Sequence, residues 1–163
     1  MIKITQATSK SDFKTIADLA TTIWTEHYTP IIGAVQVSYM LDKYQSIAAI
    51  ENQAQNGMEY YILIYQEISS GYIAILKEET SLFLSKFYVL KAQRAKGIGK
   101  KAFVFTENRA AQLNCTSVHL TVNKYNSIAI KAYEKMGFLN VKPIIQDIGE
   151  GYVMDDYLMK KHL

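Results

Sequence analysis

Alternating and helical patterns of apolar residues follow one another at the start of the chain. Alternation of isoleucine with polar residues predicts a strand over Ile2–Ala7. Apolar side chains then recur every three or four residues over Phe13–His27, which is typical of one helical face. Ser11 and Asp12 are expected to cap this helix, and Pro30 is expected to end or bend it.

A second helical pattern covers Val35–Asn56. It is compatible with one helix or with two pieces broken near Ser46. Gly57 follows as the expected C-terminal stop, since glycine adopts the left-handed conformation at helix ends without strain.

Aromatic and β-branched residues then dominate three short segments, which predicts three strands. Ser69–Gly71 is a turn signal between the first two, and Glu79 and Thr80 form a tight polar turn before the third. Connections this short require antiparallel neighbours. The predicted strands are Glu59–Glu67, Gly71–Glu78 and Ser81–Val89.

Helices and strands alternate in the remaining sequence. The pattern predicts a helix over Ile98–Leu113, a strand over Ser117–Val122 and a helix over Asn126–Met136 with Gly137 as its stop. A hairpin around Asp147–Gly151 closes the chain. This order predicts an α+β fold, a mixed sheet with helices on its faces.

The composition narrows the class of protein. A length of 163 residues predicts a single domain over residues 1–163. The net charge of +3 is small and its lysines and arginines are spread, so nucleic acid is not an expected partner. One cysteine, Cys115, excludes an internal disulfide and fits a reducing compartment. Without a signal-peptide or membrane-length apolar run, a cytoplasmic location with no membrane contact is expected.

Gly97 and Gly99 stand between a predicted strand and a predicted helix, where several phosphate-binding motifs place glycines. The P-loop pattern fails, because it needs four residues between its glycines. The dinucleotide pattern fits with Ala102 as its third small residue. However, it requires a βαβ unit and an acidic residue about 20 positions later, and the region of Ser117 has none.

The remaining interpretation uses the whole segment Arg94–Lys100. Unpaired N–H groups and the positive end of a helix dipole favour a phosphate at such a turn, and three basic side chains add charge. A solvated basic turn that binds nothing explains the segment equally well when it is taken alone.

A second segment decides between these interpretations. Asn126, Ala129, Tyr133 and the pair Gly137-Phe138 spell N-x-x-A-x-x-x-Y-x-x-x-G-F after a predicted strand. Together with Q/R-x-x-G-x-G some thirty residues earlier, this resembles the Gcn5-related N-acetyltransferases (GNAT). The resemblance implies a twisted, mostly antiparallel sheet of about seven strands flanked by about four helices. It also implies an enzyme that transfers an acetyl group from acetyl-CoA to a primary amine by direct attack. The three histidines are scattered along the sequence, so no metal is expected.

The family resemblance also implies roles for individual residues. The backbone of Phe87, Tyr88 and Val89 would pair with the pantetheine arm. Asn126 would contact the cofactor, although a helix N-cap is its simpler role. Tyr133 would be the general acid that protonates the leaving thiolate, although packing is its simpler role. The pyrophosphate would lie on Arg94, Ala95, Lys96, Gly97, Ile98, Gly99 and Lys100.

The general base stays open, because many relatives have a glutamate on the strand where this chain has Ser85 and Lys86. Glu26, His27 and His119 are the candidates. His27 also fits as a packed helix residue and His119 as a strand residue. Cys115 is expected to be a small buried side chain rather than an acetyl carrier.

The acceptor is expected to be a small-molecule amine, with a polyamine preferred. In the family, the first helical region and the last hairpin shape the acceptor pocket, which here points to Trp24, Glu26, Tyr28, Asp155 and Asp156. Carboxylates attract a polycation, and the ending GYVMDDYLMKKHL is similar to that of bacterial spermine/spermidine-type acetyltransferases. A protein or peptide acetyltransferase and a non-catalytic acetyl-CoA-binding module are the alternatives. A homodimer is compatible with the family.

Overall fold

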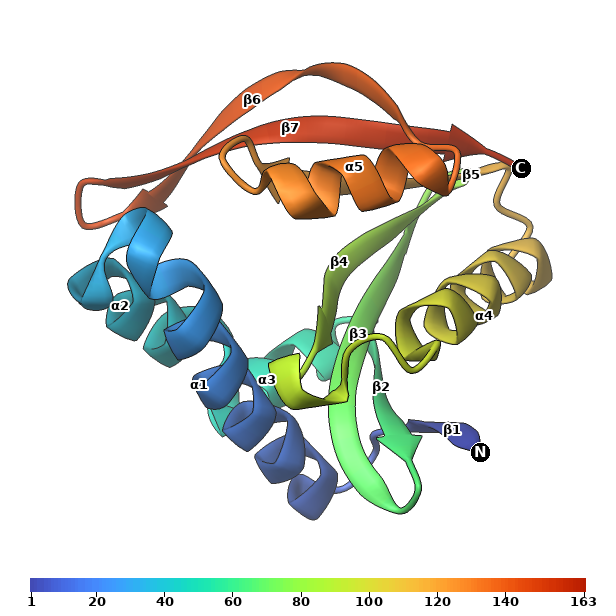
Figure 1. Cartoon of the computed structure of the whole chain (residues 1–163), viewed down its shortest axis with the longest axis horizontal. Coiled ribbons are helices and arrows are strands. Elements are labelled where there is room, and N and C mark those ends of the chain that lie inside the picture. Colours follow the sequence, from blue (N-terminus) through green and yellow to red (C-terminus); the bar gives the residue numbers. More distant parts are fainter. The chain divides into compact units, whose positions relative to one another are not determined.

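The computed structural model describes residues 1–163 and has seven strands and five α-helices (Figure 1). The strands are hydrogen-bonded in the order β1-β2-β3-β4-β5-β7-β6. This confirms the predicted mixed α/β class. The elements are β1 (Ile2–Gln6), α1 (Lys10–Ile32), α2 (Ala34–Tyr44), α3 (Ile47–Gln55), β2 (Glu59–Tyr65), β3 (Ile68–Glu78), β4 (Ser81–Val89), a 3-10 turn (Lys91–Gln93), α4 (Ile98–Gln112), β5 (Ser117–Asn123), α5 (Ser127–Lys135), β6 (Leu139–Gly149) and β7 (Tyr152–His162).

The chain forms two compact units. Unit 1 comprises Met1–Leu76 and Lys86–Thr106, and unit 2 comprises Lys77–Ser85 and Glu107–Leu163. Strands β3 and β4 and helix α4 each contribute residues to both units. Each unit is described by itself.

Unit 1 contains an antiparallel ladder of β1, β2 and β3 together with α1, α2 and α3. Region 35–56 is two helices, because Gln45 ends α2 and Ser46 caps α3. This makes five helices where about four were expected. The apolar face of α1 is buried as the pattern predicts, with Ile16 and Ala20 wholly inaccessible to solvent.

The cap predicted for α1 at Ser11 was wrong, although Asp12 takes part in capping the helix as expected. Its N-cap is Ser9, whose hydroxyl accepts a hydrogen bond from the Asp12 N–H, while the Asp12 carboxylate accepts the Ser9 N–H in return. This reciprocal capping box satisfies two N–H groups that a cap at Ser11 would leave open. Pro30 lies inside the last turn, and the helix ends only at Gly33.

The turn between β2 and β3 lies at Gln66 and Glu67, both at positive φ, and not at Ser69–Gly71 as predicted. Gly71 lies within β3, beside a bulge in the β2–β3 register. A Cβ on Gly71 would approach the Tyr88 carbonyl oxygen to 2.3 Å. The glycine therefore serves close strand approach rather than the turn.

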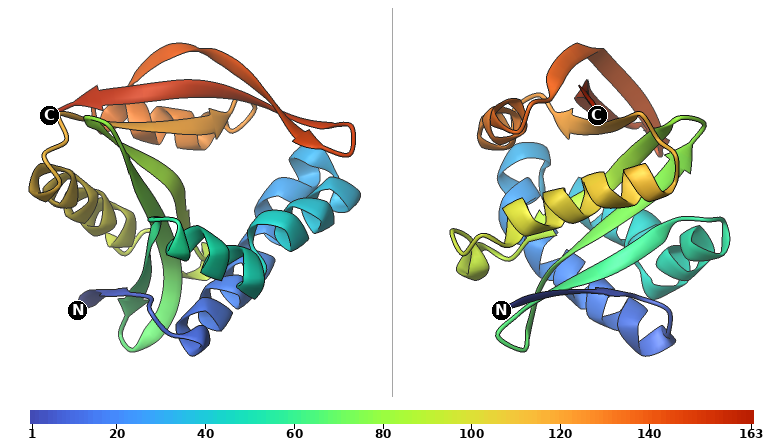
Figure 2. Two further views of the ribbon diagram at one scale, coloured as in Figure 1. Left: turned by 180° about the vertical axis from the view of Figure 1, so that it is seen from behind. Right: turned by 90° about the vertical axis from the view of Figure 1, so that its right-hand side faces the viewer.

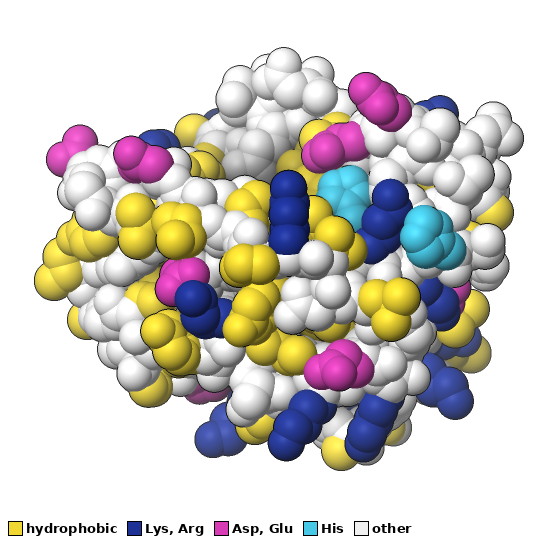
Figure 3. Space-filling view, turned by 90° about the horizontal axis from the view of Figure 1, so that it is seen from above, with side chains coloured by type: hydrophobic (Ala, Val, Ile, Leu, Met, Phe, Trp, Pro, Cys, Tyr) yellow, Lys and Arg dark blue, Asp and Glu magenta, His cyan; other side chains and the backbone are white.

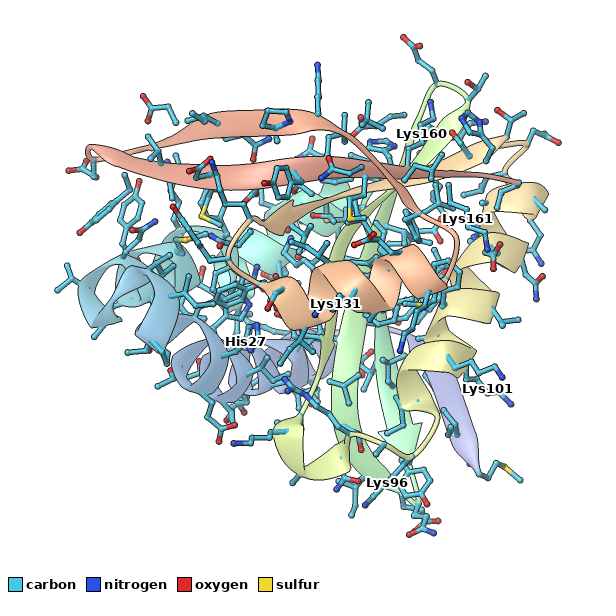
Figure 4. All side chains as sticks on the ribbon, turned by 45° about the horizontal axis from the view of Figure 1, so that its top comes forward. His27, Lys96, Lys101, Lys131, Lys160 and Lys161 are labelled. Carbon is cyan, nitrogen blue, oxygen red and sulfur yellow. The ribbon has the colours of Figure 1, made fainter.

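Unit 2 contains β5, β7 and β6 as an antiparallel ladder, with the first residues of β4 parallel to β5. Helix α5 lies along this ladder in both views of Figure 2. Its start at Ser127 and its glycine stop at Gly137, φ +99°, agree with the predicted helix. Lys160 and Lys161, neighbours on β7, point to opposite faces, as strand alternation requires (Figure 4).

Strand β6 has one edge without a partner strand and is almost entirely exposed. Hydrophobic side chains lie on the face seen from above in Figure 3, the side of the β6–β7 hairpin. The exposed large hydrophobic residues of the hairpin are Leu139, Val141, Ile145 and Val153.

Candidate active site

The predicted phosphate-binding turn of unit 1 lies between β4 and α4 and is exposed from Arg94 to Gly97. At the start of α4, the Lys101 N–H donates a hydrogen bond to the Gly97 carbonyl at 3.1 Å. The N–H groups that precede Lys101 in the first turn have no acceptor within the helix. The turn therefore presents backbone donors and basic side chains together.

The backbone of this turn is left-handed at two positions, Ala95 with φ 62° and Gly97 with φ 79°. A Cβ on Gly97 would meet no atom within 4 Å, so there is open space beside it. A Cβ on Gly99 would instead contact the Phe87 ring at 3.7 Å. Gly97 is therefore the glycine that leaves room for an anion, while Gly99 packs on β4.

The basic side chains of the turn differ in their surroundings. Arg94 Nε donates to the Val89 carbonyl at 3.4 Å. Lys96 Nζ donates to Gln93 Oε1 at 3.2 Å and lies 5.2 Å from the centre of the Tyr65 ring. The neighbouring Lys101 points outward from α4 (Figure 4).

An aromatic cluster of unit 1 brings together three residues that the sequence assigned to the site. The ring centres of Trp24 and Tyr28 lie 4.6 Å apart, and that of Tyr88 lies 5.6 Å from Trp24. The Tyr28 and Tyr88 hydroxyls are 3.4 Å apart. The Trp24 side chain is buried. Helix α1 and the end of β4, at Tyr88, are thus joined.

Two candidate bases on α1 are placed differently. Glu26 is exposed to solvent. His27 is half-buried and its ring lies edge-on to Tyr28 at 4.8 Å. Burial lowers the pKa of His27, and the positive charge of Arg94 lowers it further. His27 is therefore neutral at pH 7 and lies close enough to the basic turn to feel its charge.

Lys86 was not assigned a role from the sequence, yet it is 8% exposed. Its Nζ donates to Gln53 Oε1 at 3.1 Å, lies 3.9 Å from Met58 Sδ and lies 5.3 Å from the centre of the Tyr60 ring. Burial lowers its pKa to about 8. The alternation of β4 contains the signal for this burial, because Lys86 is in phase with the buried Leu82 and Leu84.

In unit 2, the predicted cofactor contact and general acid lie at the two ends of α5. Asn126 is buried and caps the helix, with its Oδ1 accepting the Ala129 N–H at 3.2 Å. Tyr133 is half-buried, and its ring lies edge-on to Phe138 at 5.7 Å between centres. Both simpler roles, capping and packing, are therefore present, and neither prevents contact with a ligand.

The two predicted acceptor-site carboxylates are adjacent on β7 but differ in environment. Asp155 Oδ1 lies 2.9 Å from Lys124 Nζ and forms an ion pair with it. Asp156 is 4% exposed, and its Oδ1 accepts no hydrogen bond. Burial, and to a lesser extent the charge of Asp155, raise the pKa of Asp156 to about 6.

His119 lies in a hydrogen-bonded network on the sheet of unit 2. Its Nδ1 is 2.6 Å from Ser81 Oγ, its Nε2 is 3.6 Å from Glu78 Oε2, and its ring stacks on Phe83. Burial lowers its pKa, while Glu78 acts in the opposite direction. Both ring nitrogens thus have partners. Cys115 is buried, as expected of a small packed side chain.

No group of three or more histidine, cysteine or carboxylate side chains in the chain is arranged to hold a metal ion. None of the helices is long and apolar enough to span a membrane.

Comparison with known proteins identifies the type of domain. Residues 28–154 match the family model described as an acetyltransferase (GNAT) domain. A search of curated proteins finds no match.

Solved structures are similar in fold over the full chain at low sequence identity. The PaiA N-acetyltransferase of Thermoplasma acidophilum, in complex with coenzyme A, has a TM-score of 0.83 at 20% identity, covering 100% of this chain and 99% of that one. A GNAT-family acetyltransferase of Staphylococcus aureus Mu50 has a TM-score of 0.76 at 18% identity, with coverages of 100% and 99%. The Escherichia coli ribosomal-protein-S18-alanine N-acetyltransferase has a TM-score of 0.74 at 13% identity, with coverages of 99% and 94%.

Proposed function

The chain belongs to the GNAT family of acetyltransferases, and from that premise we propose that it acetylates a primary amine of a small molecule, with a polyamine as the first candidate. It is an acyltransferase that uses acetyl-CoA as the acetyl donor. The nature of the acceptor is the part of this proposal that rests on the residues of unit 2.

The basic turn of unit 1 supports a pyrophosphate site. Backbone N–H groups at the start of α4 and the positive end of its dipole attract an anion, and Arg94 and Lys100 add charge there. The open space at Gly97 lets phosphate oxygens approach the backbone. The strand Phe87–Val89 that leads to this turn would pair with the pantetheine arm.

Tyr133 supports the chemical step. In direct attack, the amine nitrogen forms a bond to the thioester carbon, and collapse of the tetrahedral intermediate breaks the C–S bond. The departing thiolate takes the phenolic proton of Tyr133, since a phenol of pKa near 10 can donate to a developing thiolate. Asn126 caps the same helix and fixes where it starts.

The observation that carries the choice of a cationic acceptor is the carboxylate pair on β7. Asp156 is buried with an oxygen that accepts no hydrogen bond, next to Asp155. A buried carboxylate oxygen is expected to have a donor, and an alkylammonium ligand supplies both donors and compensating charge.

A peptide N-terminus is the second candidate acceptor, because one structural relative is the Escherichia coli ribosomal-protein-S18-alanine N-acetyltransferase. A peptide offers one ammonium group rather than several. Acceptors with two or more amino groups are therefore expected to be preferred over peptides if the carboxylate pair selects the substrate.

Thiol release from acetyl-CoA, measured across polyamines, amino acids, aminoglycosides and peptides, tests this proposal. We expect polyamines to give the highest kcat/KM. Tyr133→Phe should lower kcat by roughly 10²–10⁴-fold, the range for acid–base groups, with unchanged acetyl-CoA affinity by calorimetry. Tyr125→Phe is the matched control, since Tyr125 is an exposed tyrosine just before the same helix.

Each outcome is informative. Preference for a peptide would overturn the small-molecule acceptor. Binding of acetyl-CoA without thiol release to any amine would favour a non-catalytic module. Near-normal turnover of Tyr133→Phe would mean that Tyr133 is a packing residue and not the general acid.

A further inference from the structure

We propose that Asp156 is the general base of the reaction, the group that takes the proton from the attacking amine. This inference rests on the proposed amine acetylation and assigns a role that none of the three bases expected from the sequence fills well. Glu26 is exposed, and burial and the positive charge of Arg94 lower the pKa of His27. His119 has a partner at each ring nitrogen.

The environment of Asp156 differs from that of every other carboxylate in the structure. It is the one acidic residue among the buried side chains, and its Oδ1 accepts no hydrogen bond. Leaving such an oxygen without a donor costs free energy, so a fold retains it where a ligand supplies the donor. An ammonium N–H of the acceptor is a donor of the required kind.

The strand pairing places Asp156 next to the segment that carries the proposed acid. Asp156 is opposite Asn123 in the last pair of the β5–β7 ladder. The chain then runs from Asn123 to Asn126, which caps α5, the helix of Tyr133. Asp156 and Tyr133 thus belong to the same compact unit and are linked through one short connection.

The charge state of Asp156 suits a base at neutral pH. Burial first, and the adjacent Asp155 second, raise its pKa to about 6. It is therefore ionised at pH 7 yet binds a proton more strongly than an ordinary carboxylate, which improves a general base. The charged group that acts on it is Asp155 on β7, which is itself paired with Lys124 after β5. On β6 it faces the uncharged Ile144.

The proposed step balances as follows. An acceptor nitrogen enters as an ammonium, because an alkylamine of pKa near 10.4 is neutral in only about one molecule in a few thousand at pH 7. Asp156 accepts one proton, the N–C bond forms, and the positively charged nitrogen of the tetrahedral intermediate releases a second proton to solvent. The C–S bond then breaks while Tyr133 protonates the thiolate. The products are the acetamide and the CoA thiol, and the proton on Asp156 returns to the Tyr133 phenolate through solvent.

The test is the pH dependence of kcat/KM with the best amine found for the wild-type enzyme. With Asp156 as base, the wild-type profile should be flat between about pH 6 and the pKa of the amine and should fall below pH 6. In Asp156→Asn only the small fraction of amine that is already unprotonated can react. The kcat/KM of this variant should rise tenfold per pH unit up to the amine pKa. Its kcat at pH 7 should be lower than that of the wild type by a factor of roughly 10² or more.

Two comparisons separate a base from an ammonium anchor. Asp155→Asn is the matched control and should raise KM while the flat region of the profile remains. An acceptor whose ammonium pKa lies below the assay pH needs no base, so the defect of Asp156→Asn should shrink to less than about tenfold with it. Unchanged acetyl-CoA affinity by calorimetry shows that the variant is folded.

The proposal is overturned if wild-type kcat/KM shows no decline near pH 6, a result that needs no variant. It is also overturned if Asp156→Asn raises KM alone, or if its defect is the same for weakly and strongly basic amines. These results leave the proposed function intact, because that function is tested separately, by which amines the wild-type enzyme acetylates.

Discussion

Lys86 in unit 1 and Asp156 in unit 2 are two buried ionisable side chains that the fold treats in opposite ways. Both lie on strands, and burial moves the pKa of each toward neutrality. Lys86 Nζ is surrounded by an amide oxygen, a thioether and an aromatic face. Asp156 Oδ1 accepts no hydrogen bond. Burial is therefore common to both side chains, and what distinguishes them is whether their polar atoms have partners.

The partners of Lys86 also contact one another. Gln53 Oε1 accepts from both the Tyr60 hydroxyl and Lys86 Nζ, which links α3, β2 and β4 within unit 1. These partners are neutral, so they compensate the buried ammonium only in part. The comparison predicts that Lys86 contributes to stability in a pH-dependent way, while the effects of Asp156 extend to the reaction.

The largest stability effect is expected from the titration of Lys86. Its pKa is about 8 in the folded chain against 10.5 for the ordinary side chain, so the unfolded chain keeps a proton that the folded chain has lost. Stability should rise as pH increases from 7 to 10, by about 2 kcal/mol relative to Lys86→Met. Urea unfolding of both proteins at the two pH values measures this difference. If the free energy of unfolding of the wild type and of Lys86→Met depended equally on pH, folding would not change the pKa of Lys86.

A smaller effect of opposite direction is expected from Asp156. Its pKa in the folded chain, about 6, lies above the ordinary 3.8, so ionisation destabilises the fold as pH rises from 4 through 6. Asp156→Asn should raise the free energy of unfolding by about 1–2 kcal/mol at pH 8, because an amide remains buried but the charge is gone. Little gain is expected at pH 4. A variant that is less stable at pH 8 would show that the carboxylate has a hidden partner.

The smallest effect concerns the surroundings of Asp156. Lys124→Gln removes the cation that compensates Asp155 at 2.9 Å, so Asp155 repels a negative Asp156 more strongly. The decline of kcat/KM near pH 6 should move up by about half a unit, and less in high salt because exposed charges are screened. Lys131→Gln, an exposed lysine on α5, is the control and should leave the decline in place. An equal shift in both variants would indicate a general charge effect.

Local patterns predicted most of the secondary structure correctly. Each helix and strand of the structure overlaps a predicted one, because apolar periodicity and glycine stops act within a few residues. The errors were also local, and each arose where a residue fitted more than one structural role. Ser9 displaced Ser11 as the cap because only Ser9 completes the exchange with Asp12, and Gly71 indicated a turn where it actually allows close approach to Tyr88.

Sequence by itself determined the family, through the glycine turn at Gly97 and the later Asn126–Phe138 motif, and the order of the elements. It also named Asp156, although only as an acceptor contact. Only the tertiary structure decided which charged side chains lose their water and which of them find partners. The environment of Lys86 depends on Gln53 and Tyr60, which lie on other elements. The environment of Asp156 depends on β5 and β6, which pair with β7 from other parts of the sequence. No local sequence pattern contains this information.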